Sequence, residues 1–243
     1  MKQTRLFYWN TVQNFGDLLG IPLLRHYAKV DAAFAEPEEA DIVVCGSILR
    51  LLPSGWKGII LGTGAIARGN FPDLSKATVL AVRGPRTANL LKRQGLVLGD
   101  PGVLAPGLLK DPVKKTRALL VVPHWSDDSL ALRYRETPVV NVRTTNVVRI
   151  VREIASAEQV VTSSLHGLLV AWSFGIPTKV FPHGRTDQEG GTWKWEDALT
   201  PLGVKHVWGG KFREAPAQAI EDTQGRLREA FAKAAEELSC EFS

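Results

Sequence analysis

The sequence predicts an α/β protein built on parallel β-sheets. Two observations predict this class: short apolar runs alternate with helical segments along the whole chain, and several of these runs end in glycine-containing turns. Strands that are apolar throughout, rather than alternately polar, are typical of parallel sheets covered by helices on both faces. The chain has 243 residues, 44% of them hydrophobic, which is enough for one large core or two smaller ones.

Four strands are expected in the first half of the chain, over residues 4–9, 41–45, 58–61 and 78–82. The last three run into turns that contain glycine, which lets the backbone approach a ligand closely. Helices are expected over 17–30, where leucines recur at helical spacing, and over 85–94, which starts with a proline and is followed by a glycine.

A turn-rich passage near residue 112 predicts a domain boundary. It separates an N-terminal Rossmann-like domain, residues 1–112, from a C-terminal one, residues 113–243. In the second half, strands are expected over 117–122, 138–142, 159–162, 178–181 and 205–208, and helices over 147–156, 168–174 and 226–238. The simplest arrangement is two small parallel-sheet domains that face a cleft.

The most informative stretch is Ser163-Ser164-Leu165-His166-Gly167, where an expected strand ends and an apolar helix begins. Open α/β sheets bind ligands at the carboxyl ends of their strands. The N–H groups and positive dipole end of a helix start favour anions there. His166 adds an imidazole, the side chain that proteins most often use as a general acid or base. The stretch therefore predicts a site for an anionic substrate with an acid/base group in it.

A second candidate, Asn14-Phe15-Gly16-Asp17, follows the first strand. Asp17 could accept a proton from a substrate hydroxyl, and Gly16 could allow the backbone to contact a ligand. Helix capping by Asn14 or Asp17 explains the same residues without a ligand.

Polar residues also follow other expected strands. Arg83 presents a planar fork of donors that suits a carboxylate or phosphate. Arg86 lies in a first helical turn, where a cation opposes the helix dipole, so either an anionic ligand or a surface salt bridge would explain it. Asp100 lies in a turn, where it could hold a hydroxyl or position Arg83, although turn structure alone also explains it. His124 ends a strand after a proline.

Trp193 and Trp195 alternate with charged residues beside a glycine pair. Aromatic faces stack on sugar rings, so this stretch is either a sugar-binding loop or a loop anchored by packed tryptophans.

Absent motifs exclude several classes of protein. The chain has no P-loop, no Gly-x-Gly-x-x-Gly after its first strand and no Gly-x-Ser-x-Gly. Its 2 cysteines lack metal-ligand spacing, so neither a metal site nor a disulfide framework is expected. The net charge of +5 suits an anionic partner, but no nucleic-acid-binding motif accompanies it. No apolar run approaches the ~20 residues of a membrane span, and a cytoplasmic protein is expected.

Taken in order, these motifs resemble the polysaccharide pyruvyltransferase family, and most of all its short bacterial exopolysaccharide members. The resemblance covers about residues 5 to 185, and the stretches that carry it are Asn14 to Asp17, Ala81 to Thr87, Gly99 to Leu104, Val122 to His124, Ser163 to Gly167 and Gly175 to Pro177.

The resemblance implies a GT-B-like fold with two Rossmann-type domains, the acceptor on the N-terminal side and the donor at the Ser163–Gly167 motif. It implies phosphoenolpyruvate as donor, a terminal hexose of a polysaccharide repeat as acceptor and a pyruvate ketal as product, with no cofactor or metal. Arg83 and the Leu165-His166 pair would contact phosphoenolpyruvate. The full set of candidates comprises His166 and Asp17 as catalytic residues and Arg83, Leu165, Ser163, Ser164, Gly16, Asn14, Asp100, His124 and Arg86 as substrate-binding residues.

The expected chemistry leaves alternatives open. His166 would either protonate the methylene carbon of phosphoenolpyruvate or bind its phosphate, while Asp17 takes a proton from the attacking hydroxyl. A lipid-linked acceptor would bring the enzyme to the inner face of the membrane. Two other functions fit the sequence: a GT-B glycosyltransferase that uses a nucleotide sugar, and a non-catalytic glycan- or phosphate-binding protein.

Overall fold

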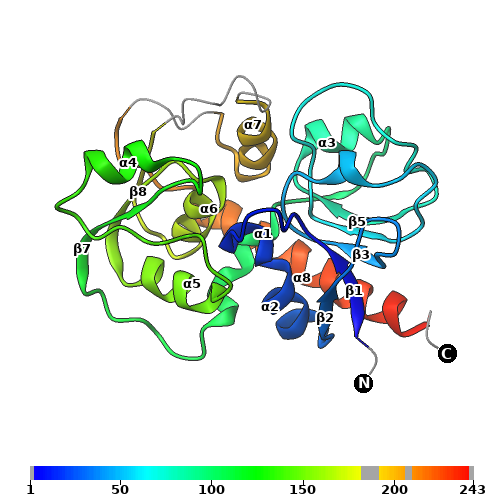
Figure 1. Ribbon diagram of the computed structural model, residues 1–243, viewed down its shortest axis with the longest axis horizontal. Helices are drawn as coiled ribbons and strands as arrows, with labels where there is room; N and C mark the ends of the chain where they lie inside the picture. The colour runs from blue at the N-terminus through cyan, green and yellow to red at the C-terminus, as the bar shows by residue number, and fades with distance from the viewer. Residues whose placement is uncertain (1–2, 182–191, 206–209, 241–243) are drawn as a thin grey trace.

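Two parallel β-sheets form the framework of the protein (Figure 1). The computed structural model describes residues 3–181, 192–205 and 210–240. The first sheet has the strand order β2-β1-β3-β4-β5-β6 and the second the order β7-β8-β9, and every pair of neighbouring strands is parallel. The α/β class and the parallel sheets predicted from the sequence are confirmed.

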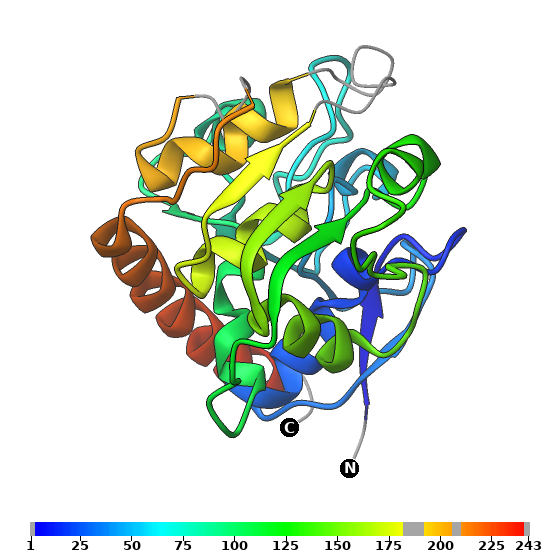
Figure 2. The same ribbon diagram turned by 90° about the vertical axis from the view of Figure 1, so that its left-hand side faces the viewer.

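The strands are β1 Thr4–Phe7, β2 Ala32–Phe34, β3 Ile42–Val43, β4 Ile59–Leu61, β5 Thr78–Val82, β6 Val97–Leu98, β7 Arg117–Val122, β8 Ala157–Thr162 and β9 Thr178–Val180. The α-helices are α1 Phe15–Leu18, α2 Gly20–Leu23, α3 Pro85–Leu90, α4 Asp128–Arg133, α5 Val147–Ala155, α6 Leu165–Ser173, α7 Trp193–Leu199 and α8 Ala217–Cys240. Shorter turns are the π-helix η1 Leu24–Ala28 and the 3-10 helices η2 Leu49–Leu51, η3 Pro101–Leu108 and η4 Thr200–Leu202. Figure 2 shows β7, β8 and β9 side by side.

Several expected elements differ from those observed. The strand expected over 138–142 is reduced to a single bridge between Val139 and Val121. The short strands β2 and β6 were not expected, because each has too few residues for a recognisable pattern. The helix expected over 17–30 is broken into α1, α2 and η1. Trp193 and Trp195 lie on α7 rather than on a loop. Residues 206–208 of the last expected strand lie outside the described residues.

The strands of the first sheet precede residue 112 and those of the second follow it, but the two halves share a core. One cluster of buried apolar side chains includes Leu6 and Ile59 of the first sheet together with Val160 and Leu168 of the second half. The terminal helix α8 contacts β4, β5 and β6, so the end of the chain packs against the first sheet (Figure 1). Burial of these apolar faces against each other holds the halves together.

None of the helices within residues 3–181, 192–205 and 210–240 is long and apolar enough to cross a bilayer.

Candidate active site

A cavity of about 350 Å³ lies at the carboxyl ends of both sheets. The side chains that line it come from the segments that follow β1, β3, β4, β5, β7 and β8, and from α7. They are Trp9, Asn14, Asp17, Ser47, Ile48, Arg50, Leu51, Ile66, Arg83, His124, Trp125, Ser163, Ser164, Leu165, His166, Lys194 and Trp195. Open α/β sheets bind their ligands at this edge, so the cavity is the candidate active site.

His166 lies in the first turn of α6, which is buried from Leu165 to Trp172. Ser164 caps this helix, because its Oγ accepts a hydrogen bond of 3.2 Å from the Gly167 N–H. Only 9% of His166 is exposed, and its Nε2 has no hydrogen-bond partner within the described part of the chain. The nearest carboxylate oxygen, Oδ1 of Asp100, lies 3.7 Å from Nε2. A buried polar atom in this state is available to a bound ligand.

Gly16 brings the first half of the chain against the imidazole. A Cβ atom at this position would lie 2.2 Å from Nδ1 of His166, so any side chain here would force the ring to move. Glycine therefore allows the loop between β1 and α1 to pack directly on the ring. This close approach also places Asp17 in the same cavity as His166.

The Asp17 carboxyl has an environment suited to proton transfer. Burial raises its pKa above the ordinary value, and His166, the Asn14 side chain and Lys194 oppose that shift. Asn14 Nδ2 donates to Asp17 Oδ2 at 2.8 Å, which orients the carboxylate. Asn14 also caps α1, since its side chain accepts from the Gly16 N–H. Asn14 is therefore the helix cap, while Asp17 lines the cavity and its catalytic role stays a prediction.

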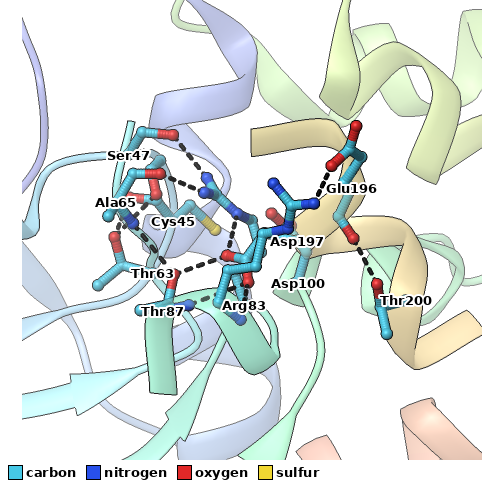
Figure 3. Close-up of polar contacts among 12 residues, drawn as sticks. Cys45, Ser47, Thr63, Ala65, Arg83, Thr87, Asp100, Glu196, Asp197 and Thr200 are labelled. Carbon is cyan, nitrogen blue, oxygen red and sulfur yellow. Dashed lines mark hydrogen bonds and ion pairs between the residues drawn. The ribbon is translucent and has the colours of Figure 1, made fainter. Parts of the chain in front are cut away.

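Arg83 borders the cavity but is held by the protein itself (Figure 3). Its Nε lies 3.2 Å from Asp197 Oδ2, its Nη1 donates to Ser47 Oγ at 2.5 Å, and its Nη2 donates to the Ala65 carbonyl. The side chain is 1% exposed. These bonds engage three of the five guanidinium N–H groups. Contact between Arg83 and phosphoenolpyruvate remains a prediction.

Asp197 is a structural residue that the sequence did not single out. Its carboxylate accepts from the backbone N–H groups of Arg86 and Thr87, at 2.8 and 3.1 Å, and from Thr87 Oγ1 at 2.6 Å. It therefore caps α3 from a helix that lies more than 100 positions later in the chain, and α7 lies beside α3 in Figure 1. No local motif marks such a residue. The one indication of such a residue is that an arginine buried at a strand end requires a buried carboxylate as its partner.

Arg86 and Asp100 are not among the residues that line the cavity, and their contacts stabilise the packing of neighbouring elements. The Arg86 guanidinium pairs with Glu196 and lies 6.0 Å from the Trp193 ring centroid, so it docks α7 onto α3. Asp100 caps η3 by accepting from the Gly102 N–H at 2.9 Å and faces His166. Asp197, rather than Asp100, holds Arg83.

The remaining predicted residues join two loops at the second sheet. Ser163 Oγ accepts a 2.9 Å hydrogen bond from the His124 N–H, which ties the end of β8 to the end of β7. The His124 ring contacts Ser126 Oγ, 2.9 Å from its Nδ1. Both residues, with Ser164 and Leu165, line the cavity. Trp9, Trp125, Arg50 and Lys194 line it without having been predicted, although Trp9 ends one expected strand and Trp125 follows another.

Comparison with known proteins supports the resemblance seen in the motifs. The chain matches the family model of polysaccharide pyruvyl transferases over residues 3–184. It is 27% identical to the succinoglycan biosynthesis protein ExoV of Rhizobium meliloti (strain 1021), over 82% of this chain and 65% of that protein. It is also 27% identical to the uncharacterized protein L143 of Acanthamoeba polyphaga mimivirus, over 60% of this chain and 55% of that protein. The chain thus spans less than two thirds of the length of these curated relatives.

A solved structure of an uncharacterized protein from Klebsiella pneumoniae is similar at a TM-score of 0.45 and 15% identity, covering 82% of this chain and 87% of that one.

The family match includes all the strands from β1 to β9 and every loop that lines the cavity; among the described segments that line the cavity, α7 alone lies beyond it. It includes both Asp17 and the Ser163–Gly167 motif with His166. The chain therefore belongs to the polysaccharide pyruvyl transferase family.

Proposed function

We propose that the protein transfers pyruvate from phosphoenolpyruvate to a hexose of an exopolysaccharide repeat, forms a pyruvate ketal and releases phosphate. The observation that carries this proposal is the family match, whose residues 3–184 include the loops that bring Asp17 and His166 to one cavity. The name of the relative ExoV, a succinoglycan biosynthesis protein, agrees with a polysaccharide acceptor.

The donor, as an anion, suits the start of α6. Backbone N–H groups at a helix N-terminus and the dipole of the helix attract phosphate and carboxylate groups. Ser163, Ser164 and Leu165 border the cavity at this point. Arg83, which follows β5 and is paired with Asp197, reaches the cavity from the first sheet and would contact the donor from there. We place the donor at the start of α6 and the acceptor toward the loop after β1, in a GT-B-like arrangement of the two halves.

Proton transfer is the first chemical step. His166, flanked by the carboxylates of Asp100 and Asp17, donates a proton to the methylene carbon of phosphoenolpyruvate. The double-bond electrons form the new C–H bond and leave a cationic carbon that bears the phosphate. Imidazole is suited to this role because it exchanges protons near neutral pH.

The sugar then takes the place of phosphate at the same carbon. One hydroxyl attacks the cationic carbon and gives its proton to Asp17, and the C–O bond to phosphate breaks. The second hydroxyl closes the ketal ring, and its proton leaves with the phosphate. Asp17 then returns its proton to His166, so the two hydroxyl protons balance the one gained by carbon and the one carried by phosphate. The raised pKa of Asp17 makes it a better proton acceptor than an ordinary carboxylate.

An acceptor screen tests the proposal. The protein is incubated with phosphoenolpyruvate and oligosaccharides that end in galactose, glucose or mannose, free or lipid-linked, and both phosphate release and product mass are followed. Release that depends on one class of acceptor, with the mass of one pyruvate ketal added, is the expected result. No release with any acceptor, together with thermal stabilisation by a nucleoside diphosphate but not by phosphoenolpyruvate, would favour a glycosyltransferase that uses a nucleotide sugar.

A further inference from the structure

We propose that Trp9 and Trp125 form the acceptor subsite of the cavity, where their rings stack on the apolar face of a pyranose. The inference rests on the proposed function, because it assigns a place to the acceptor hexose. It differs from that function in naming the residues and the contact that recognise the sugar.

The two tryptophans come from different sheets and meet at the cavity. Trp9 follows β1 and Trp125 follows β7, and both line the cavity while remaining partly exposed. Their ring centroids lie 5.3 Å apart with 39° between the planes. A ligand against this pair touches both halves of the protein, in the cavity that Asn14 and Asp17 also line.

The pair is held in place before any ligand binds. The Trp125 carbonyl accepts a 2.9 Å hydrogen bond from Arg143 Nε, and the Trp125 ring lies 5.4 Å from the His124 ring. Trp9 packs against the buried cluster of the first sheet, and Trp125 against the cluster that spans both halves. A fixed aromatic wall loses little conformational entropy on binding.

The spacing determines how a ligand can approach. A ring inserted between two others needs about 7 Å, or two contacts of about 3.5 Å each, and the observed 5.3 Å leaves no room for one. A ligand therefore lies on the outward face of the pair, which is apolar and suits the C–H groups of a pyranose.

The neighbouring polar groups suit the hydroxyls of a sugar. Asn14 caps α1 and Asp17 lies on it, shortly after Trp9 in the chain; the two side chains are hydrogen-bonded to each other at 2.8 Å and line the same cavity. Amide and carboxylate groups bind sugar hydroxyls. An aromatic pair beside such groups is therefore suited to a hexose.

Trp193 and Trp195, the two tryptophans that the sequence suggested for sugar stacking, are too buried for that role. Trp193 is 9% exposed and Trp195 is 3% exposed, because both anchor α7. Their rings offer too little surface for a sugar to cover.

Saturation-transfer NMR with methyl β-glucopyranoside, methyl β-galactopyranoside and methyl α-mannopyranoside tests the subsite in the presence of phosphoenolpyruvate. We expect saturation to be strongest on the protons of one ring face. Trp9→Leu and Trp125→Leu should each raise the Kd of the bound sugar by about 2- to 12-fold, the range for an aromatic contact, and Trp125→Phe by less. Phe212→Leu is the matched control, since Phe212 is 37% exposed and lies outside the cavity, and it should leave the Kd unchanged.

A second measurement avoids any loss of folding in the variants. The 7 tryptophans of the wild-type chain can be labelled with fluorine, and sugar should shift the resonances of Trp9 and Trp125 but not that of the buried Trp56. Absence of saturation with all three sugars, an unchanged Kd in both leucine variants, or unshifted Trp9 and Trp125 resonances would each overturn the subsite. Loss of thermal stabilisation by phosphoenolpyruvate in well-folded Trp9→Leu and Trp125→Leu proteins would also overturn it, since the pair would then serve the donor.

Failure of the subsite and failure of the proposed function give different results. Sugar binding that depends on both tryptophans, without acceptor-dependent phosphate release, supports the subsite and contradicts pyruvyl transfer. Phosphate release with an unchanged acceptor KM in both leucine variants supports pyruvyl transfer and contradicts the subsite.

Discussion

The Nε atom of Arg83 lies 3.2 Å from Oδ2 of Asp197, and the two side chains are 1% and 0% exposed. The pair connects the end of β5 in the first half with α7 in the second (Figure 3). Ser47 and Ala65 accept the other hydrogen bonds of the guanidinium, and Arg86 and Thr87 satisfy the carboxylate. A buried ion pair with this many partners is sensitive to the loss of either member.

We therefore expect Asp197→Ala to destabilise the protein by about 3–5 kcal/mol, because it leaves the charge of Arg83 buried without a counter-ion. Urea denaturation measures the change. Glu153→Ala is the control, since it breaks the more exposed pair Arg149–Glu153 and should cost about 0.5 kcal/mol or less. Similar losses in the two variants would contradict the structural role of Asp197.

His166→Gln should lower acceptor-dependent phosphate release by about 10²- to 10⁴-fold, the usual contribution of a general acid. His26→Gln serves as the control, because His26 is exposed on η1 and lies outside the cavity. Steady-state assays that vary phosphoenolpyruvate would compare kcat and KM. An unchanged kcat in His166→Gln would eliminate His166 as the proton donor.

Gly16→Ala should displace the imidazole, because the new methyl group would lie 2.2 Å from Nδ1 of His166. To relieve this contact the ring must move by about 1 Å, and a misplacement of that size costs about 100-fold in activity when it affects a catalytic group. In Gly225→Ala the new methyl group meets nothing within 4 Å on α8, so this control should keep full activity and gain about 0.5–1 kcal/mol of stability. Equal activity in the two variants would mean that the ring need not sit where the structure places it.

Asp17→Asn should stabilise the protein at neutral pH while removing its activity. Burial raises the pKa of Asp17 above its ordinary value of 3.8. Between pH 3.8 and the raised pKa, the folded protein therefore binds more protons than the unfolded chain. The free energy of unfolding of the wild type therefore falls as pH rises through the raised pKa, and the asparagine variant lacks this loss. The advantage of the variant should shrink as the pH is lowered toward 3.8.

Asp73→Asn should change the free energy of unfolding in the opposite direction when measured by the same urea denaturation. Hydrogen bonds from Ser75, including one of 2.9 Å from its N–H, lower the pKa of the exposed Asp73. This variant should be less stable than the wild type at neutral pH, and the deficit should vanish as the pH falls through the lowered pKa. Parallel pH profiles for Asp17→Asn and the wild type would contradict the proposed environment of Asp17.

The positions of the glycine turns were predicted from the sequence, but the groups that pack against them were not. The turns after β1 and β4 were expected to let the backbone approach a ligand. The groups that approach them are side chains of the protein: His166 at Gly16, and Arg83 at Gly64, where a Cβ would lie 2.5 Å from Cζ. A turn in the sequence indicates that glycine is needed there. The side chain that packs against the glycine comes from a distant part of the chain, so the sequence does not indicate it.

Local patterns in the sequence predict the α/β class, the parallel strands, the strand-to-helix position of His166 and a helix cap at Asn14 or Asp17, of which the structure shows Asn14. These features depend on apolar patterns and on hydrogen bonds between residues a few positions apart. The sequence does not indicate that Asp100 faces His166, that Asp197 holds Arg83 or that Trp9 meets Trp125. Those pairs arise because packing the two sheets and α7 into a shared core brings distant side chains together, and a buried charge must then find its partner there.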